Sequence, residues 1–376
     1  MCQSIDFFSE TCPIMKRNLL LFYWFLGSIT YAQTSVITLK PGHLNANNKD
    51  FFVAKVLDLR KGTTNIGRVL NGQAEATNAI LGNNTTQAIE AFLNRNFNAQ
   101  KTDTLTPITL TIKEFKITEK LISGNYVAGN LTMNLGFETY QEGKRVELTS
   151  ANSGSSYTRP LKQNETVEQV IRKSLESQLK GFGNWYVQNN KTFGKLARRV
   201  QLIFDEDSLK TESPNGDTIY YSAKRRLTWN DFKGRPSLFS RWAAQIFASF
   251  GFEASAKVKN RVLELRVQPS VWTDRTISWV QPSAKNDYTL AHEQLHFDIT
   301  KLIVERFKQK LRSMTFSIED YSSEIQYQYL EFYRDLGQLQ QQYDQQTDHG
   351  LDKAQQAAWS EKIQKELRFF GVMLPK

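Results

Sequence analysis

With 376 residues, the chain is longer than one typical hydrophobic core needs and is suited to two domains. An apolar content of 40% with 12% aromatic residues excludes a largely disordered protein. The net charge of +10 is scattered, and its densest groups are Lys224–Arg226 and Arg198–Arg199. Because nucleic-acid-binding proteins gather basic residues on one face beside aromatic platforms, we expect no nucleic-acid partner.

Residues 1–33 have the features of a secretory signal peptide. The basic residues Lys16 and Arg17 precede an apolar run, Leu19–Ile29, and the sequence TYAQ follows it as a cleavage site. We therefore predict a signal peptide over 1–33, with translation starting at Met15, and a secreted or periplasmic bacterial protein. The run is too short to span a bilayer comfortably, so we expect no stable membrane insertion after cleavage. A retained signal anchor is the alternative.

Both cysteines, Cys2 and Cys12, precede the predicted cleavage point. The mature chain would therefore contain neither a disulfide nor a thiolate metal ligand.

Residues 34–200 are predicted to form an α+β accessory or binding domain, an antiparallel sheet with helices packed on it. In chain order, the patterns predict a strand at 50–60, a capped amphipathic helix at 83–97 and a half-buried strand at 106–117. A hairpin with its turn at 141–144 and a long helix at 164–188 follow.

Residues 201–376 are predicted to form a second domain, separated from the first by a polar stretch with a turn signal at 213–217. Alternating strands come first, the short apolar sequence TISWV follows, and two long helices are expected at about 288–312 and 316–345. This part should therefore contain a short sheet and long helices.

Two of the four histidines lie in the sequence HEQLH, as His292 and His296. Residues four apart share one face of a helix, so both imidazoles can bind one zinc ion. Glu293 projects about 100° round the helix from His292, beside the open position of the metal. There it can take a proton from a zinc-bound water. The alternative is a pair of ordinary helix histidines in a satisfied core.

A catalytic zinc ion usually has three protein ligands, and we predict His349 as the third. The two long helices can fold back as a hairpin, which would bring His349 to the start of the motif helix. Glu324 and Glu331 are the fallback ligands, and a helix C-terminal histidine interacting with the helix dipole is the alternative for His349.

Three further side chains have predicted roles near this site. Tyr343 and Asp344 would orient a ligand, and Tyr343 could instead donate a hydrogen bond to a developing oxyanion or simply pack in the core. Asp298 should point away from the metal, as a helix-positioning residue or a solvated charge.

Four segments together resemble a bacterial family, domain of unknown function 922: LTWNDFKGRP, TISWV, LAHEQLHFDIT and YDQQTDHGLDKAQQAAW. The resemblance covers about 220–365, and members are described as secreted zinc-dependent proteases. It implies a metal at His292 and His296, catalysis by Glu293, a role for Tyr343–Gly350 and a zincin-like catalytic domain over 201–376. The WNDFKG sequence has no ligand pattern and is either an anchored turn or a wall of the substrate cleft.

The resulting hypothesis is a secreted zinc metallopeptidase that cleaves a peptide or protein substrate. Glu293 would act as general base towards water with a pKa of about 7, and the strand at Trp279-Val280 would pair with extended substrate. A zinc-binding envelope protein without proteolytic activity, and a metal-dependent hydrolase of cell-wall or glycan amides, are the alternatives. The sequence contains no signal of oligomeric state.

Overall fold

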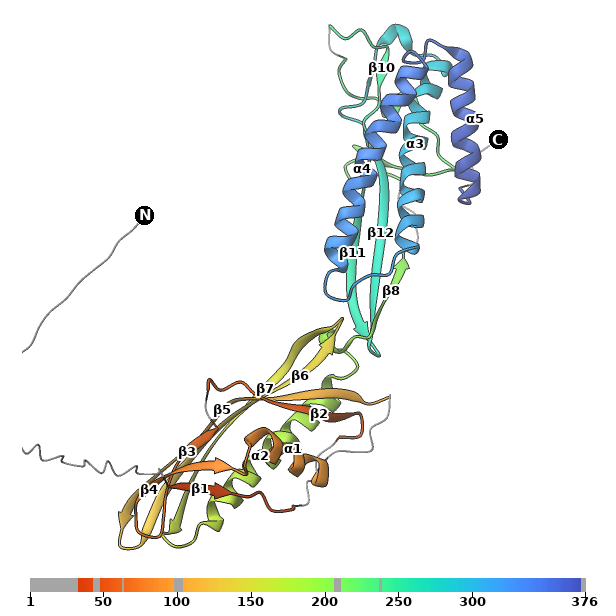
Figure 1. Cartoon of the computed structure of the whole chain (residues 1–376). Coiled ribbons are helices and arrows are strands. Elements are labelled where there is room, and N and C mark those ends of the chain that lie inside the picture. Colours follow the sequence, from red (N-terminus) through yellow and green to blue (C-terminus); the bar gives the residue numbers. More distant parts are fainter. Residues whose placement is uncertain are drawn as a thin grey trace, which may run out of the picture.

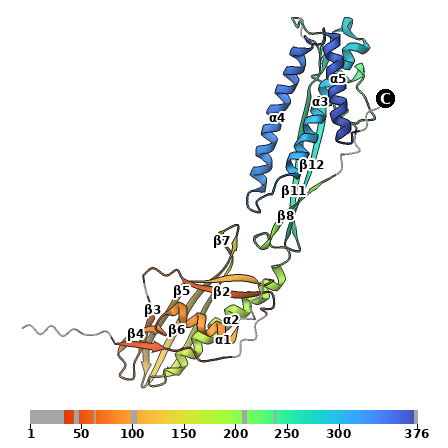
Figure 2. The same ribbon diagram turned by 45° about the vertical axis from the view of Figure 1, so that its right-hand side comes forward.

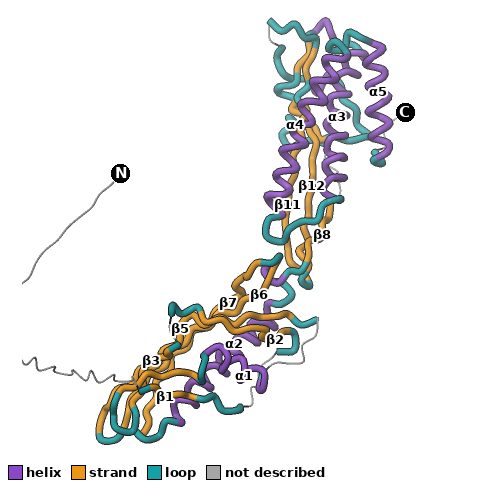
Figure 3. Tube along the Cα trace, viewed as in Figure 1, coloured by secondary structure: helices purple, strands orange, loops and turns teal. Residues whose placement is uncertain are grey.

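The computed structural model describes residues 33–42, 48–62, 64–97, 104–205, 211–236 and 239–372. Nearly all of the predicted signal peptide, residues 1–32, lies outside this part of the chain. Within it, five α-helices and several sheets form two bodies, one built from the first half of the chain and one from the second (Figures 1 and 3). None of the helices described here is long and apolar enough to cross a membrane.

The first body contains a seven-stranded sheet in the order β1-β4-β3-β5-β6-β7, with β2 paired to β5. Its strands are β1 (Thr34–Ile37), β2 (Phe51–Asp58), β3 (Asn65–Leu70), β4 (Ala76–Leu81), β5 (Thr106–Ser123), β6 (Tyr126–Gln141) and β7 (Lys144–Pro160). The predicted α+β class is confirmed, but the sheet is mixed and not antiparallel. Three pairings are parallel, β1 with β4, β2 with β5 and β3 with β5.

Helices α1 (Thr85–Asn96) and α2 (Glu165–Asn189) cover one face of this sheet (Figures 1 and 2). The predicted cap of α1 is present, because the Asn84 side chain accepts a hydrogen bond from the Gln87 N–H. Aromatic side chains fill the space between α2 and the sheet, and the rings of Phe182 and Phe137 stack at 4.1 Å. Leu196 is the last residue in the sequence that belongs to this core, and the next residue, Ala197, packs in a core of the second body.

The second body begins with a four-stranded sheet in which β12 pairs with β11, β8 and β9. A separate two-stranded sheet is formed by β10, which precedes β11 in the chain, and β13, which follows β12. The strands are β8 (Arg199–Phe204), β9 (Thr218–Tyr220), β10 (Ala244–Gln245), β11 (Ala248–Lys259), β12 (Val262–Asp274) and β13 (Trp279–Val280).

Three helices pack beside these strands: α3 (Asp287–Arg312), α4 (Tyr321–Gln346) and α5 (Lys353–Phe369). The first two are the predicted long helices, and they run as a hairpin, since residues near the end of α4 contact the start of α3. Helix α5 was not predicted, although its cap is clear: the Asp352 carboxylate accepts from two backbone N–H groups. The zincin-like architecture of this body stays a prediction.

The hairpin turn of β6 and β7 reaches the loop between α3 and α4. Glu142 at this turn accepts hydrogen bonds from the Ile318 N–H at 2.7 Å and the Ser317 hydroxyl at 2.8 Å. These bonds lower the pKa of the exposed Glu142 carboxyl below its ordinary value. The first body therefore contacts the end of the α3–α4 hairpin that lies farthest from His292.

Candidate metal centre

Helix α3 presents the two motif histidines on one face, as predicted. The helix begins at a cap, where the Asn286 side chain accepts from the Thr289 N–H. The apolar residues Leu295, Ile299, Leu302 and Ile303 of the same helix are all buried and anchor it in the core. The rings of His292 and His296 lie 5.0 Å apart and nearly perpendicular. The core thus fixes the helix, and both imidazoles face the end of α4.

Asp344 on α4 is the residue that the hairpin brings to these histidines. Its Oδ1 atom lies 3.3 Å from His292 Nε2 and 3.0 Å from His296 Nε2. One donor atom from each residue lies within 4.8 Å of the others. The edge of a tetrahedron around zinc with bonds of about 2.0 Å measures about 3.3 Å, so this donor set fits zinc in chemistry and spacing.

His349, the predicted third ligand, is not among the three donors. Its Nδ1 lies 3.9 Å from Asp344 Oδ2, and its ring stacks on Trp242. The structure brings Asp344, and not His349, within 3.3 Å of both histidine Nε2 atoms. Because α4 ends at Gln346, the position of His349 is set by the turn that follows this helix. The fallback residues lie elsewhere: Glu324 accepts from the Ser317 N–H near the other end of α4, and Glu331 pairs with Arg334.

Outer contacts orient His292 through its second ring nitrogen. Its Nδ1 lies 2.8 Å from the Tyr343 hydroxyl and 3.1 Å from Gln356 Oε1 on α5. Such partners fix the tautomer that leaves Nε2 free for a metal. Tyr343 is fully buried and does not line the cavity, so its placement favours the orienting role over the oxyanion role. His296 Nδ1 is buried with no hydrogen-bond partner among the described residues.

Glu293 is buried next to the metal donors and is held by a backbone contact. Its Oε2 accepts a hydrogen bond of 2.8 Å from the Ile246 N–H, just after β10. Burial raises the pKa of Glu293 above its ordinary value, against the lowering effects of His296, His292 and that N–H. A raised pKa suits a carboxylate that takes up a proton and returns it.

For Asp344 and His296, the mutual hydrogen bonds and charges outweigh the effect of burial on the pKa. Burial would raise the pKa of Asp344, but hydrogen bonds and charge from His292 and His296 lower it well below its ordinary value. Burial would lower the pKa of His296, but its hydrogen bond with Asp344 and that carboxylate's charge raise it. Asp344 therefore stays ionised, as a metal ligand must.

Asp298 is buried beside the motif and does not act as a solvated charge. Its carboxylate accepts from the Tyr221 hydroxyl at 3.0 Å and from Gln294 Nε2 at 2.8 Å, and it pairs with Arg226 at 3.4 Å. Gln294 in turn accepts from the Leu227 N–H at 2.8 Å. These contacts tie α3 to the segment 221–227, in agreement with the predicted positioning role.

A cavity of about 290 Å³ opens onto the candidate metal ligands and Glu293. One wall is the segment 242–246, which includes β10, and the other walls are the first turns of α3 and the end of α4 with the turn 349–351. β10 pairs with one edge of the predicted substrate strand Trp279-Val280, and neither of these two residues lines the cavity. The strand beside the cavity is β10 itself.

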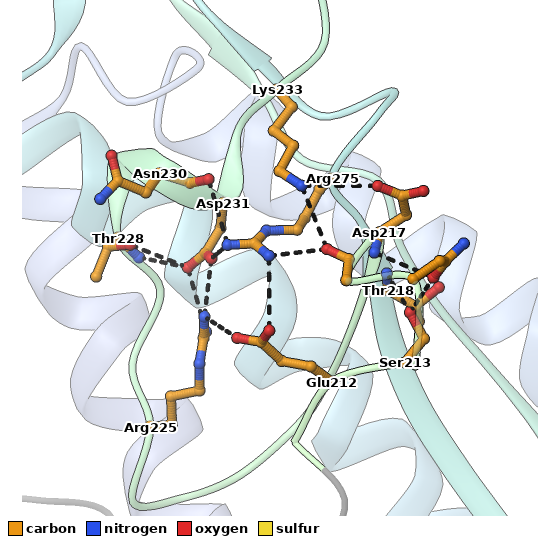
Figure 4. Close-up of polar contacts among 12 residues, drawn as sticks. Glu212, Ser213, Asp217, Thr218, Arg225, Thr228, Asn230, Asp231, Lys233 and Arg275 are labelled. Carbon is orange, nitrogen blue, oxygen red and sulfur yellow. Dashed lines mark hydrogen bonds and ion pairs between the residues drawn. The ribbon is translucent and has the colours of Figure 1, made fainter.

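The WNDFKG sequence forms an anchored turn (Figure 4). Asp231, at the end of the 3₁₀ helix η2 (Trp229–Asp231), accepts from Thr228 N–H and Arg225 at 2.8 Å each and from Arg275 at 2.9 Å. The Gly234 N–H donates to Ser278 O at 2.9 Å, and a Cβ at Gly234 would lie 2.9 Å from that oxygen. This turn therefore clamps the loop before β13. None of the cavity-lining residues described above comes from it.

Replacing Asp231 with alanine is expected to lower the free energy of unfolding by about 3 kcal/mol, because two arginines lose a buried partner. Burial would raise the pKa of Asp231, but the bonds from Arg225 and Thr228 lower it, so the carboxylate is charged. Urea denaturation measures the change. Asp217→Ala is the matched control: its exposed pair with Lys233 at 3.6 Å should contribute about 1 kcal/mol or less. Equal losses would contradict the anchoring role.

Comparison with solved structures gives distant similarity. The chain is similar to the protein XCC0632 of family DUF330 from Xanthomonas campestris, with TM-score 0.23, 14% identity and coverage of 42% of this chain and 94% of that chain. It is also similar to a minor lipoprotein from Acinetobacter baumannii, with TM-score 0.17, 12% identity and coverage of 36% and 90%. No curated protein matches the sequence.

The family model "Bacterial protein of unknown function (DUF922)" matches residues 276–350. This range contains His292, Glu293, His296 and Asp344, whereas Ile246 and Gln356 lie outside it. The predicted family is therefore confirmed for residues 276–350, which form a DUF922 domain, a bacterial domain of unknown function. The segment LTWNDFKGRP and the residues after Gly350 lie outside this match.

Proposed function

We propose that this protein is an exported zinc-dependent peptidase, with zinc held by His292, His296 and Asp344. The observation that carries the proposal is the convergence of both Nε2 atoms on Asp344 Oδ1, next to the buried Glu293. Two histidines and a carboxylate form a ligand set of hydrolytic zinc sites. Export rests on the predicted signal peptide over 1–33, of which residues 1–32 are not described.

Bound zinc supplies Lewis acidity, which activates water and polarises a carbonyl group. The protein's own groups do the rest. Glu293 holds and moves the proton at its carboxylate, and the Ile246 N–H fixes one carboxylate oxygen. Tyr343 and Gln356 hold the His292 ring, so that its Nε2 keeps its direction. The burial of His292, Glu293 and His296 strengthens these electrostatic interactions.

The edge of β10 that faces away from β13 pairs with no other described strand, and it favours an extended polypeptide as substrate over a glycan. Backbone groups of alternate residues point to the same side of a strand. Ala243 and Phe247 face β13, since Ala243 O accepts from the Gln281 N–H and the Phe247 N–H donates to Ser278. Ile246 faces Glu293 instead, so Ala244 also presents its N–H and C=O away from β13. An extended chain can add to that edge.

Cleavage assays with the purified full-length chain test the proposal. We expect stoichiometric zinc by mass spectrometry and cleavage of an unfolded protein, lost with chelator and restored by added zinc. Cleavage of cell-wall material in place of protein would assign a different bond. Zinc binding without chelator-sensitive cleavage of either substrate would leave a non-proteolytic metal protein and contradict the proposal.

A further inference from the structure

The turn after α4 contains three consecutive residues with left-handed backbone. The φ angles are +47° at Asp348, +51° at His349 and +86° at Gly350. Glycine adopts this region freely, but it is unfavourable for other residues, and two such residues in succession are uncommon. Residues held in this way gather at functional sites, where the surrounding structure compensates for the strain.

This backbone places the His349 ring at the cavity beside the three metal donors. The ring lies on Trp242, with centroids 3.7 Å apart, and 38% of the His349 side chain is exposed. Its Nδ1 lies 3.9 Å from Asp344 Oδ2, beyond hydrogen-bond distance. His349 therefore lines the cavity with part of its ring exposed.

Gly350 is required for the same arrangement. A Cβ atom at this position would lie 3.1 Å from His292 Nδ1, and its carbonyl accepts a hydrogen bond of 2.7 Å from the Tyr288 hydroxyl. The turn is thus pinned to the start of α3. It sets the distance between His349 and the metal donors independently of the helical phase of α4.

We propose that His349 contacts the substrate and donates a hydrogen bond to the carbonyl oxygen of the bond to be cleaved. This inference rests on the proposed function. Trp242 holds the imidazole from one face, so the edge of the ring can point into the cavity between β10 and Asp344. A fixed donor at this place would stabilise negative charge on that oxygen in the transition state.

The variant His349→Asn tests the inference, because asparagine tolerates left-handed backbone. We expect zinc content equal to that of the wild type, a Tm that does not fall, and a kcat about 100-fold lower with KM little changed. Asp348→Asn is the matched control in the same turn. It keeps the His349 ring and should retain wild-type zinc content and kcat.

The outcomes separate this inference from the proposed function. Loss of zinc in His349→Asn would make His349 a metal ligand and overturn the inference while leaving a zinc peptidase in place. Retained zinc with wild-type kcat would also overturn it, as would a fall in Tm that alone accounts for the lost activity. A wild-type protein that binds zinc but shows no chelator-sensitive cleavage would refute the proposed function, and the role of His349 with it.

Discussion

Replacing Glu293 with glutamine is expected to lower kcat by about 100-fold to 10,000-fold while zinc content stays unchanged. Glutamine has the same shape and can still accept the hydrogen bond from the Ile246 N–H, so the local structure should persist. It cannot take a proton from water. Burial raises the pKa of Glu293 because it destabilises the ionised carboxylate in the folded protein, so the metal-free Glu293→Gln variant should unfold at an equal or higher temperature than the metal-free wild type.

Glu305 on the same helix provides the matched control. It is also buried, and its Oε1 lies 3.0 Å from both Lys301 Nζ and Lys308 Nζ, remote from the cavity. Glu305→Gln should lower Tm with no specific loss of kcat, which is the reverse of the Glu293 pattern. A fully active Glu293→Gln protein would show that another group moves the proton, and the assigned base would be wrong.

The features that could be predicted from the sequence depend on local spacing. His292 and His296 share a helix face because four residues make about one turn, and the apolar residues Leu295, Ile299 and Leu302 at helical spacing mark a helix that packs in the core. The β6–β7 hairpin was likewise predicted, since its turn lies between adjacent strands. The parallel pairings of the first sheet were not, because they join strands that are distant in sequence and leave no periodic signal.

The position of Asp344 beside both histidines was not predicted, for a similar reason. A hairpin of two helices predicts that the end of α4 meets the start of α3, but not which residue faces it. The buried positions Leu336 and Tyr343, with Gln340 bonded to Thr300, mark the face of α4 towards α3, and Asp344 continues it one turn after Gln340. The helical spacing of these residues could have indicated Asp344 from the sequence. His349 follows the helix end, so its position depends on the left-handed turn and could not be extrapolated.

Asp344 is therefore the residue whose loss should remove the metal. We expect Asp344→Ala to bind zinc more than about 100-fold more weakly, a larger loss than outer contacts usually cause, because only two histidine donors remain. Asp344→Asn keeps one oxygen donor without its charge and should fall between this variant and the wild type. Competition with a chromophoric chelator measures all three affinities.

The control for this series is Asp335→Ala, an exposed carboxylate on the same helix. Its zinc affinity should equal that of the wild type, because it lies more than two turns from the donors. The comparison with His349→Ala decides between the two candidate third ligands. If His349→Ala loses zinc and Asp344→Ala keeps it, the ligand set is His292, His296 and His349, and Asp344 only orients the histidines. If Asp344→Ala alone loses zinc, the Asp344 carboxylate is the third ligand, and α4 contributes to the reaction by holding the metal.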